Sequence, residues 1–128
     1  MKTIKEIQEA LAQCYGTEGY HQWNPLFRKM VLTDGTKTVA EMCGAYWLMD
    51  LIGSYQSKCL GDEMLRDMQF WTLRKKGDDW EVICERDTDD IFLTQDIPFS
   101  DFPLPEGIKL YVAPADEEYY VIMLPSEY

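Results

Sequence analysis

The chain has 128 residues, and its formal net charge of -11 comes entirely from its second half. Residues 1–60 carry six basic and six acidic side chains, whereas residues 61–128 carry six basic and seventeen acidic ones. Such a field repels nucleic-acid phosphates and anionic membrane surfaces, and it attracts basic partners. The charge therefore argues against direct binding of DNA, RNA or a membrane, and it favours a protein partner with a basic surface.

The length suits one domain spanning residues 1–128, and the 46% hydrophobic and 13% aromatic content predicts a folded core. The N-terminus lacks the apolar segment of a signal peptide, so we expect a cytoplasmic protein. The longest apolar stretch, at about 42–52, is shorter than the ~20 residues that span a bilayer. The four cysteines form no Cys-x-x-Cys pair and there is one histidine, so we expect reduced thiols, no metal site and no cofactor.

The N-terminal segment predicts a helix. Thr3 and Glu6 have the spacing of a capping box, which satisfies free amide groups where a helix begins. Apolar residues then recur at helical spacing until Gly16, which ends the helix. A loop rich in aromatic rings follows at residues 17–25.

A short strand is predicted at about 27–32, and it leads into a turn at 33–36 with Asp-Gly at its centre. A second capping box, Thr38 to Glu41, opens a central helix that we extend to about Gln56. The middle of this helix is apolar almost all the way round, which indicates that it is covered on most sides.

The second half of the chain changes from helical to strand-like periodicity after a polar linker at 57–67. The predicted strands are 68–75, 80–86, 91–97, 108–113 and 119–124. Three prolines enforce an irregular crossing between the third and fourth of these. The fold class is therefore α+β, with a long buried central helix and the N-terminal helix packed on an antiparallel sheet of about five to six strands.

Four stretches together resemble a family of small, acidic, uncharacterised proteins of bacteria and mobile elements, a domain of unknown function. They are Thr33-Asp34-Gly35, Gly44-Ala45-Tyr46-Trp47-Leu48-Met49-Asp50, Asp101-Phe102-Pro103-Leu104 and Leu124-Pro125-Ser126-Glu127-Tyr128. The resemblance covers nearly the whole chain. It implies one compact cytoplasmic domain from a bacterial genome or mobile element, and it implies no activity, ligand or catalytic residue.

The aromatic loop and the central helix hold the candidate ligand-binding residues, which are Tyr20, His21, Trp23, Asp34, Trp47 and Asp50. His21 is the only imidazole, and Asp34 or Asp50 could orient it. Cys43 would complete a Cys–His–Asp arrangement for nucleophilic catalysis, but the spacing does not show that these groups meet. A thiol in an apolar helix is more often an inert buried side chain, so we predict no catalytic residue.

Asp50 lies in an apolar stretch, where an unpaired carboxylate is costly to bury. We expect it to accept a hydrogen bond from an indole N–H, a tyrosine hydroxyl or backbone amides near the aromatic loop. The alternative is that it forms the floor of a small polar pocket under that loop, beside Trp47.

The acidic residues gather in predicted turns. The candidate acidic surface consists of Asp78, Asp79, Asp87, Asp89, Asp90, Asp116, Glu117 and Glu118. Residues 87–90 lack the glycine and closing glutamate of a calcium loop. Such clusters usually keep exposed turns soluble, but on one face they could imitate the phosphates of a duplex and block a nucleic-acid-binding protein.

The favoured interpretation is a non-enzymatic module that binds another protein, with a homodimer as a further option. The alternative is a small enzyme or small-molecule-binding domain that uses the loop at 17–23 and the central helix. The C-terminal stretch Leu124–Tyr128 either docks on the domain, as we expect, or serves as a free linear ligand.

Overall fold

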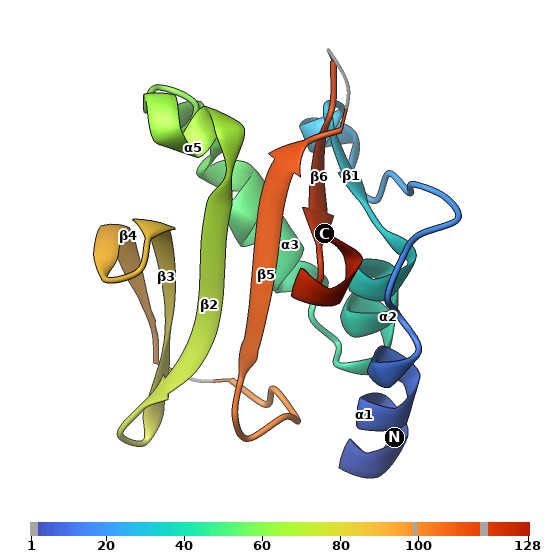
Figure 1. Cartoon of the computed structure of the whole chain (residues 1–128). Coiled ribbons are helices and arrows are strands. Elements are labelled where there is room, and N and C mark those ends of the chain that lie inside the picture. Colours follow the sequence, from blue (N-terminus) through green and yellow to red (C-terminus); the bar gives the residue numbers. More distant parts are fainter. Residues whose placement is uncertain (1–2, 99, 116–117) are drawn as a thin grey trace.

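Most of the sheet consists of the strands that the sequence predicts. The computed structural model describes residues 3–98, 100–115 and 118–128, and within them six strands pair in the order β1-β6-β5-β2-β3-β4 (Figure 1). They are β1 Met30–Leu32, β2 Gln69–Lys76, β3 Asp79–Asp87, β4 Asp90–Ile97, β5 Ile108–Pro114 and β6 Tyr120–Met123. With the helices, this sheet confirms the α+β class.

The sheet is mixed rather than purely antiparallel, because β1 pairs in parallel with β6 and Val31 lies opposite Val121. These strands come from opposite ends of the chain, so no hairpin turn sets their relative direction. All three residues of β1 are buried, which is typical of a strand covered on both faces. The expectation of an antiparallel sheet is therefore wrong at this edge.

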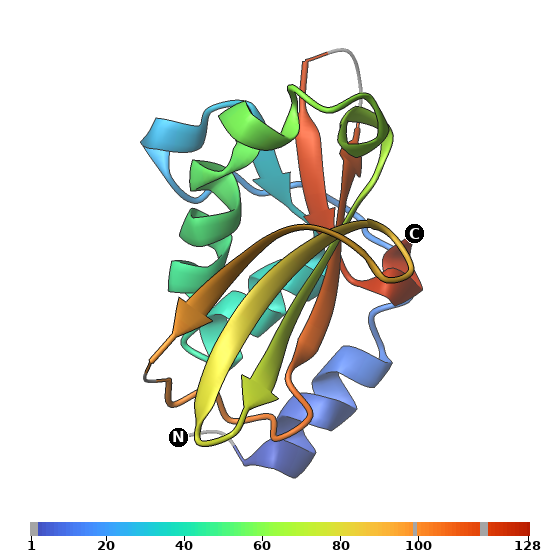
Figure 2. The same cartoon turned by 90° about the vertical axis from the view of Figure 1, so that its left-hand side faces the viewer.

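The longer helices lie mostly behind the sheet, as the views in Figure 1 and Figure 2 show. The helical elements are α1 Ile4–Ala12, η1 Pro25–Phe27, α2 Asp34–Met42, α3 Tyr46–Ser54, α4 Gln56–Cys59, α5 Glu63–Asp67 and η2 Pro125–Glu127. The expected packing of α1 on the sheet is wrong, because α1 packs mainly on α2, where Ile7 is fully buried. Among the described residues, no helix is long and apolar enough to cross a membrane.

The prediction of a single long central helix is also wrong, because the chain forms two helices, α2 and α3, which are separated at Gly44. Gly44 has φ +60°, a left-handed conformation that glycine adopts without the steric cost of a side chain. The amide of Ala45 donates to the carbonyl of Ala40 at 2.9 Å, which is the closing hydrogen bond of a Schellman motif. The apolar segment therefore changes direction at Gly44 and does not form one continuous helix.

Residues 33–36, predicted as a turn, form the start of α2. Thr33 is the N-cap, since its hydroxyl accepts from the amide of Thr36 at 3.2 Å while its own amide donates to the Thr36 hydroxyl at 3.0 Å. The Thr36 hydroxyl also donates to the carbonyl of Ile122 at 2.8 Å. The helix thus begins before the expected Thr38 box, where it is attached to β6.

The core between helices and sheet contains a hydrogen-bonded pair of glutamines. Gln56 and Gln69 donate to each other through their amide groups, both at 2.9 Å, and the indole of Trp71 donates to Gln69 at 2.9 Å. At one end of the sheet the irregular crossing packs Phe102 edge-on to Trp80, with ring centroids 5.8 Å apart. The first contact joins α4 to β2, and the second joins the irregular crossing to β3.

Candidate functional site

The aromatic loop is fixed to the start of α2 by two acceptor atoms of one carboxylate. His21 Nε2 donates to Asp34 Oδ1 at 2.7 Å, and the amide of Glu18 donates to Asp34 Oδ2 at 3.0 Å. The hydrogen bond from His21 is the main reason that the pKa of Asp34 lies below its ordinary value. The backbone of His21 also pairs with Leu32 in both directions at 2.8 Å. His21 and Asp34 therefore meet as the sequence suggested, within a network that anchors the loop.

The C-terminal stretch docks beside this network. Glu127 accepts from the Thr33 hydroxyl at 2.6 Å and from the Gly35 amide at 3.0 Å, and Ser126 donates to the carbonyl of Cys14. The C-terminal stretch therefore docks on the domain, as the sequence analysis expects. Tyr128 nevertheless stays 79% exposed, with only the edge of its ring near Tyr111.

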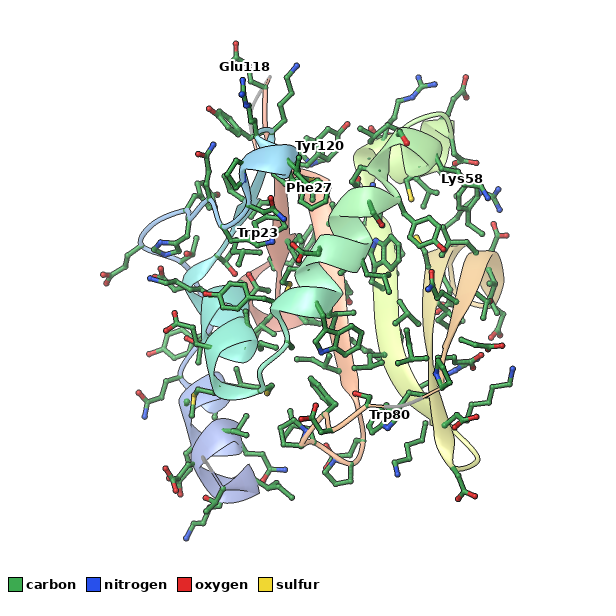
Figure 3. All side chains as sticks on the ribbon, turned by 180° about the vertical axis from the view of Figure 1, so that it is seen from behind. Trp23, Phe27, Lys58, Trp80, Glu118 and Tyr120 are labelled. Carbon is green, nitrogen blue, oxygen red and sulfur yellow. The ribbon has the colours of Figure 1, made fainter. Side chains whose placement is uncertain are left out.

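Asp50 has the hydrogen bond that the sequence analysis favours. Its Oδ1 accepts from the indole of Trp23 at 2.8 Å and from the side chain of Asn24 at 3.0 Å. Figure 3 shows Trp23 between its own loop and α3, with Phe27 beside it. Trp47 is half-buried against the core and Tyr20 is 56% exposed. Asp50 thus joins the loop to α3 as a structural acceptor.

The Cys43–His21–Asp34 arrangement does not form. Asp34 is the first residue of α2 and Cys43 follows its last residue, which separates them by about 13 Å along the helix axis. Burial also raises the pKa of Cys43 to about 11, so its thiol is a poor nucleophile at neutral pH. The pKa of Cys84 is also raised above its ordinary value, first by its hydrogen bond with Cys59 and then by burial.

The acidic turns divide between the two ends of the sheet. Asp78 and Asp79 lie at the start of β3, whereas Asp87, Asp89 and Asp90 lie at its far end, about 26 Å away by strand rise. In Figure 3 Glu118 marks one end and Trp80, next to Asp79, lies toward the other. Asp116 and Glu117 fall outside the described residues. The described acids therefore form two separate clusters rather than one unbroken row.

Arginine pairs with one of these carboxylates, that of Asp90, and with two acidic side chains outside the candidate surface. Arg86 pairs with Asp62 at 2.8 Å and with Asp90 at 3.0 Å, and its guanidinium holds the pKa of Asp62 below its usual range. Arg74 pairs with Glu81 at 2.7 Å. In the described part of the chain, no group of three histidine, cysteine or carboxylate side chains is placed to hold a metal ion.

Two adjoining hollows lie at the aromatic loop. One of about 560 Å³ is lined by Gln22, Trp23, Asn24, Pro25, Arg28 and Tyr119. The other, of about 230 Å³, is lined by Tyr20, Gln22, Val31, Ala115 and Tyr119. Tyr20 and Trp23 thus contribute to hollows, whereas His21, Asp34, Trp47 and Asp50 line neither of them.

A third hollow, of about 390 Å³, lies across β5, β2 and β3 on the face of the sheet away from α3. No helical residue lines this hollow, and we call this part of the sheet the helix-free face. Apart from Trp71, its lining residues come from alternate positions of these strands and from the β3–β4 turn: Phe70, Thr72, Arg74, Ile83, Glu85, Asp87, Thr88, Asp89, Lys109 and Tyr111. Figure 2 shows the β3–β4 turn and η2 on the side of the sheet opposite α3. Sequence reasoning missed this site, although aromatic and threonine side chains alternate with the core positions of β2.

One comparison with known proteins gives a match. A model of a family of unknown function (DUF6876) matches residues 5–128. The chain belongs to this family. The comparisons with curated proteins and with solved structures give no match. The DUF6876 match thus agrees with the resemblance in its extent, and it assigns no activity to either the aromatic loop or the helix-free face.

Proposed function

We propose that this DUF6876 protein is a binding module, and that the helix-free face of its sheet receives an extended basic segment of another protein. The observation that carries the proposal is the 390 Å³ hollow on that face, which combines aromatic rings with carboxylates. Antiparallel sheets often leave one face to solvent, and a hollow there with partly exposed rings is typical of a docking surface. The separation of Cys43 from His21 favours binding over nucleophilic catalysis.

A basic protein segment fits the charges better than a nucleic-acid-binding groove. Imitation of a duplex needs carboxylates along one continuous face, whereas the described acids divide between two ends of the sheet. A short segment needs only one of these ends. The resemblance supports a bacterial or mobile-element origin and the cytoplasm as the setting of this binding.

Selection from a displayed library of short random peptides tests the proposal. We expect enriched peptides to contain arginine or lysine together with apolar residues, and their affinity to fall as salt is raised. In the Thr72→Arg variant, a bulky cation stands on the floor of the hollow, so the affinity should fall by about tenfold or more. The matched control is Gln8→Arg, because Gln8 is exposed on α1, away from this face.

Three results would overturn this function. They are enrichment of peptides without basic residues, equal affinity of wild type and Thr72→Arg, and enrichment of no peptide at all. Light scattering adds a further check, because a dimer that Thr72→Arg dissociates would assign the face to a second copy of this chain. Circular dichroism of Thr72→Arg shows whether the variant is folded, and Thr94→Arg, on the same face of β4, replaces it if it is not.

A second candidate function is binding of a small molecule at the aromatic loop. The hollow of about 560 Å³ has a volume typical of ligand sites, and the rings of Trp23 and Tyr119 line it together with Arg28. Thermal unfolding against a library of anionic metabolites tests this function. A stabilising compound whose effect is lost in Arg28→Ala would support it, and stabilisation that is equal in the variant would contradict it.

A further inference from the structure

The hollow on the helix-free face has a ring wall built by cross-strand pairing. In the register of the sheet, Phe70 lies opposite Tyr111 on one side and Glu85 on the other. The rings of Phe70 and Tyr111 meet edge to face, with centroids 5.1 Å apart. Thr72 and Ile83, which are opposite each other, form the floor. A carboxylate therefore stands next to an aromatic pair at the same level of the sheet.

Two further carboxylates reach the rim because β3 is irregular at its end. The register of β3 with β4 shifts on both sides of Glu85, which bends the strand. Asp89 adopts φ 62°, and its amide donates to Glu85 Oε2 at 2.9 Å, so the turn lies over the hollow. Among the described residues, no lysine or arginine forms an ion pair with Glu85, Asp87 or Asp89. The rim thus carries three carboxylates without an ion pair, while the two cations of the lining are Arg74, which pairs with Glu81, and Lys109.

Elsewhere in the sheet, the same chemistry surrounds an arginine of the protein itself. The guanidinium of Arg86 lies 4.8 Å from the ring centre of Phe92 while it pairs with Asp62 and Asp90. An aromatic ring and two carboxylates are a favourable environment for the planar, weakly hydrated guanidinium group. The hollow has a ring pair and three carboxylates, and it has room for the side chain.

We propose that this hollow binds an arginine side chain of the partner, with its guanidinium between the Phe70–Tyr111 rings and the carboxylates of Glu85, Asp87 and Asp89. The inference rests on the proposed function and names the residue that the partner supplies. The stem of the arginine packs on the floor over Thr72 and Ile83. Arginine fits better than lysine because its flat group can stack on a ring and donate to two carboxylates together.

Lys109 sets the orientation of the bound segment. It lies on β5 opposite Thr72, and it has no ion-pair partner among the described residues. β5 and β3 are two strand spacings apart, about 10 Å, which an extended peptide crosses in about three residues. The segment therefore carries an acidic residue or a free carboxylate about three positions from its arginine.

Titration with N-acetyl-arginine amide, followed by amide chemical shifts, tests the site. We expect saturable shifts at residues 70, 72, 83, 85, 87–89 and 111. The matched probe N-acetyl-citrulline amide has the same shape without the charge, and its affinity should be lower by about tenfold or more. The Glu85→Gln/Asp87→Asn variant should lose a similar factor, whereas Asp78→Asn/Asp79→Asn, at the other end of the sheet, should bind as wild type does.

The arginine site is wrong if the citrulline probe binds equally, if both double variants weaken binding alike, or if no shifts occur at the hollow. The displayed peptides separate this failure from failure of the proposed function. Peptides that lose affinity in Thr72→Arg but keep it in Glu85→Gln/Asp87→Asn would retain the face as a docking surface without an arginine site. Peptides that keep their affinity in both variants would overturn the function as well.

Discussion

The hydroxyl group of Thr33 donates a 2.6 Å hydrogen bond to the carboxylate of Glu127, 94 positions later in the chain. The amide of Gly35 donates to the same carboxylate, which therefore places negative charge at the positive end of the α2 dipole. A Cβ atom on Gly35 would come within 2.5 Å of Glu127 Oε1, so only glycine leaves room for this contact. Two of the stretches that carry the family resemblance, 33–35 and 124–128, are thus hydrogen-bonded to each other.

Replacing Glu127 with alanine should lower the free energy of unfolding by about 1–3 kcal/mol, because the Gly35 amide and the Thr33 hydroxyl lose their acceptor. Urea unfolding followed by circular dichroism measures the change. Tyr128→Ala is the matched control, since Tyr128 is 79% exposed and its removal should cost less than about 0.5 kcal/mol. Equal stability of Glu127→Ala and wild type would show that this contact does not hold the tail.

The glutamine pair in the core gives a second prediction. Gln69→Leu should lower the free energy of unfolding by about 2–4 kcal/mol, since the indole of Trp71 loses its acceptor and Gln56 Oε1 loses its donor in the core. Gln56→Leu/Gln69→Leu removes both amides, so it should cost less than the sum of the two single changes. Additive costs in this double-mutant cycle would contradict a coupled pair.

The antiparallel hairpins were predictable because their information is local. The strand-like periodicity and the acidic turns lie side by side in the sequence, and β2, β3 and β4 follow them within a few residues. The parallel pairing of β1 with β6 depends on segments at opposite ends of the chain, for which no turn carries a signal. Gly44 was visible in the sequence, but its left-handed conformation was not, so two helices were predicted as one.

The candidate site was predictable only where burial demands a partner. Asp50 needs a donor in an apolar helix, and the indole of Trp23 in the nearby loop supplies it as expected. The hollow around Phe70 could not be found in this way, because periodicity shows that two faces of a strand differ and not which face the helices leave open. Only the register places Phe70, Tyr111 and Glu85 in one row.

The four thiols should react with iodoacetamide at very different rates. Cys14 is half-buried, whereas Cys43, Cys59 and Cys84 are buried, so native protein at neutral pH should be alkylated at Cys14 first. Burial and then the charges of Glu127 and Asp34 raise the pKa of Cys14, which keeps even this reaction slow. Mass spectrometry of timed samples measures the order, and early labelling of Cys43 would contradict it. Glu127→Gln removes one of these charges and should speed labelling of Cys14.

Acid should weaken the joint between the aromatic loop and α2. The pKa of Asp34 is lowered from its ordinary value of 3.8, first by the hydrogen bond from His21 and then by that from the Glu18 amide. A carboxyl group whose pKa is lower in the folded state contributes stability above its unfolded pKa, and that contribution is lost as pH falls through the folded value. The free energy of unfolding should therefore decline below about pH 4, and less steeply in Asp34→Asn.

The control for this acid limb is Asp78→Asn, which removes a carboxylate at the exposed β2–β3 turn. It should leave the slope below about pH 4 as in wild type, because Asp78 is exposed and has no hydrogen bond or ion pair among the described residues. Urea unfolding at a series of pH values measures the slopes. His21→Gln should shift the Asp34 titration, followed by carboxyl chemical shifts, toward higher pH. An unchanged titration would mean that His21 does not stabilise the charged form of Asp34.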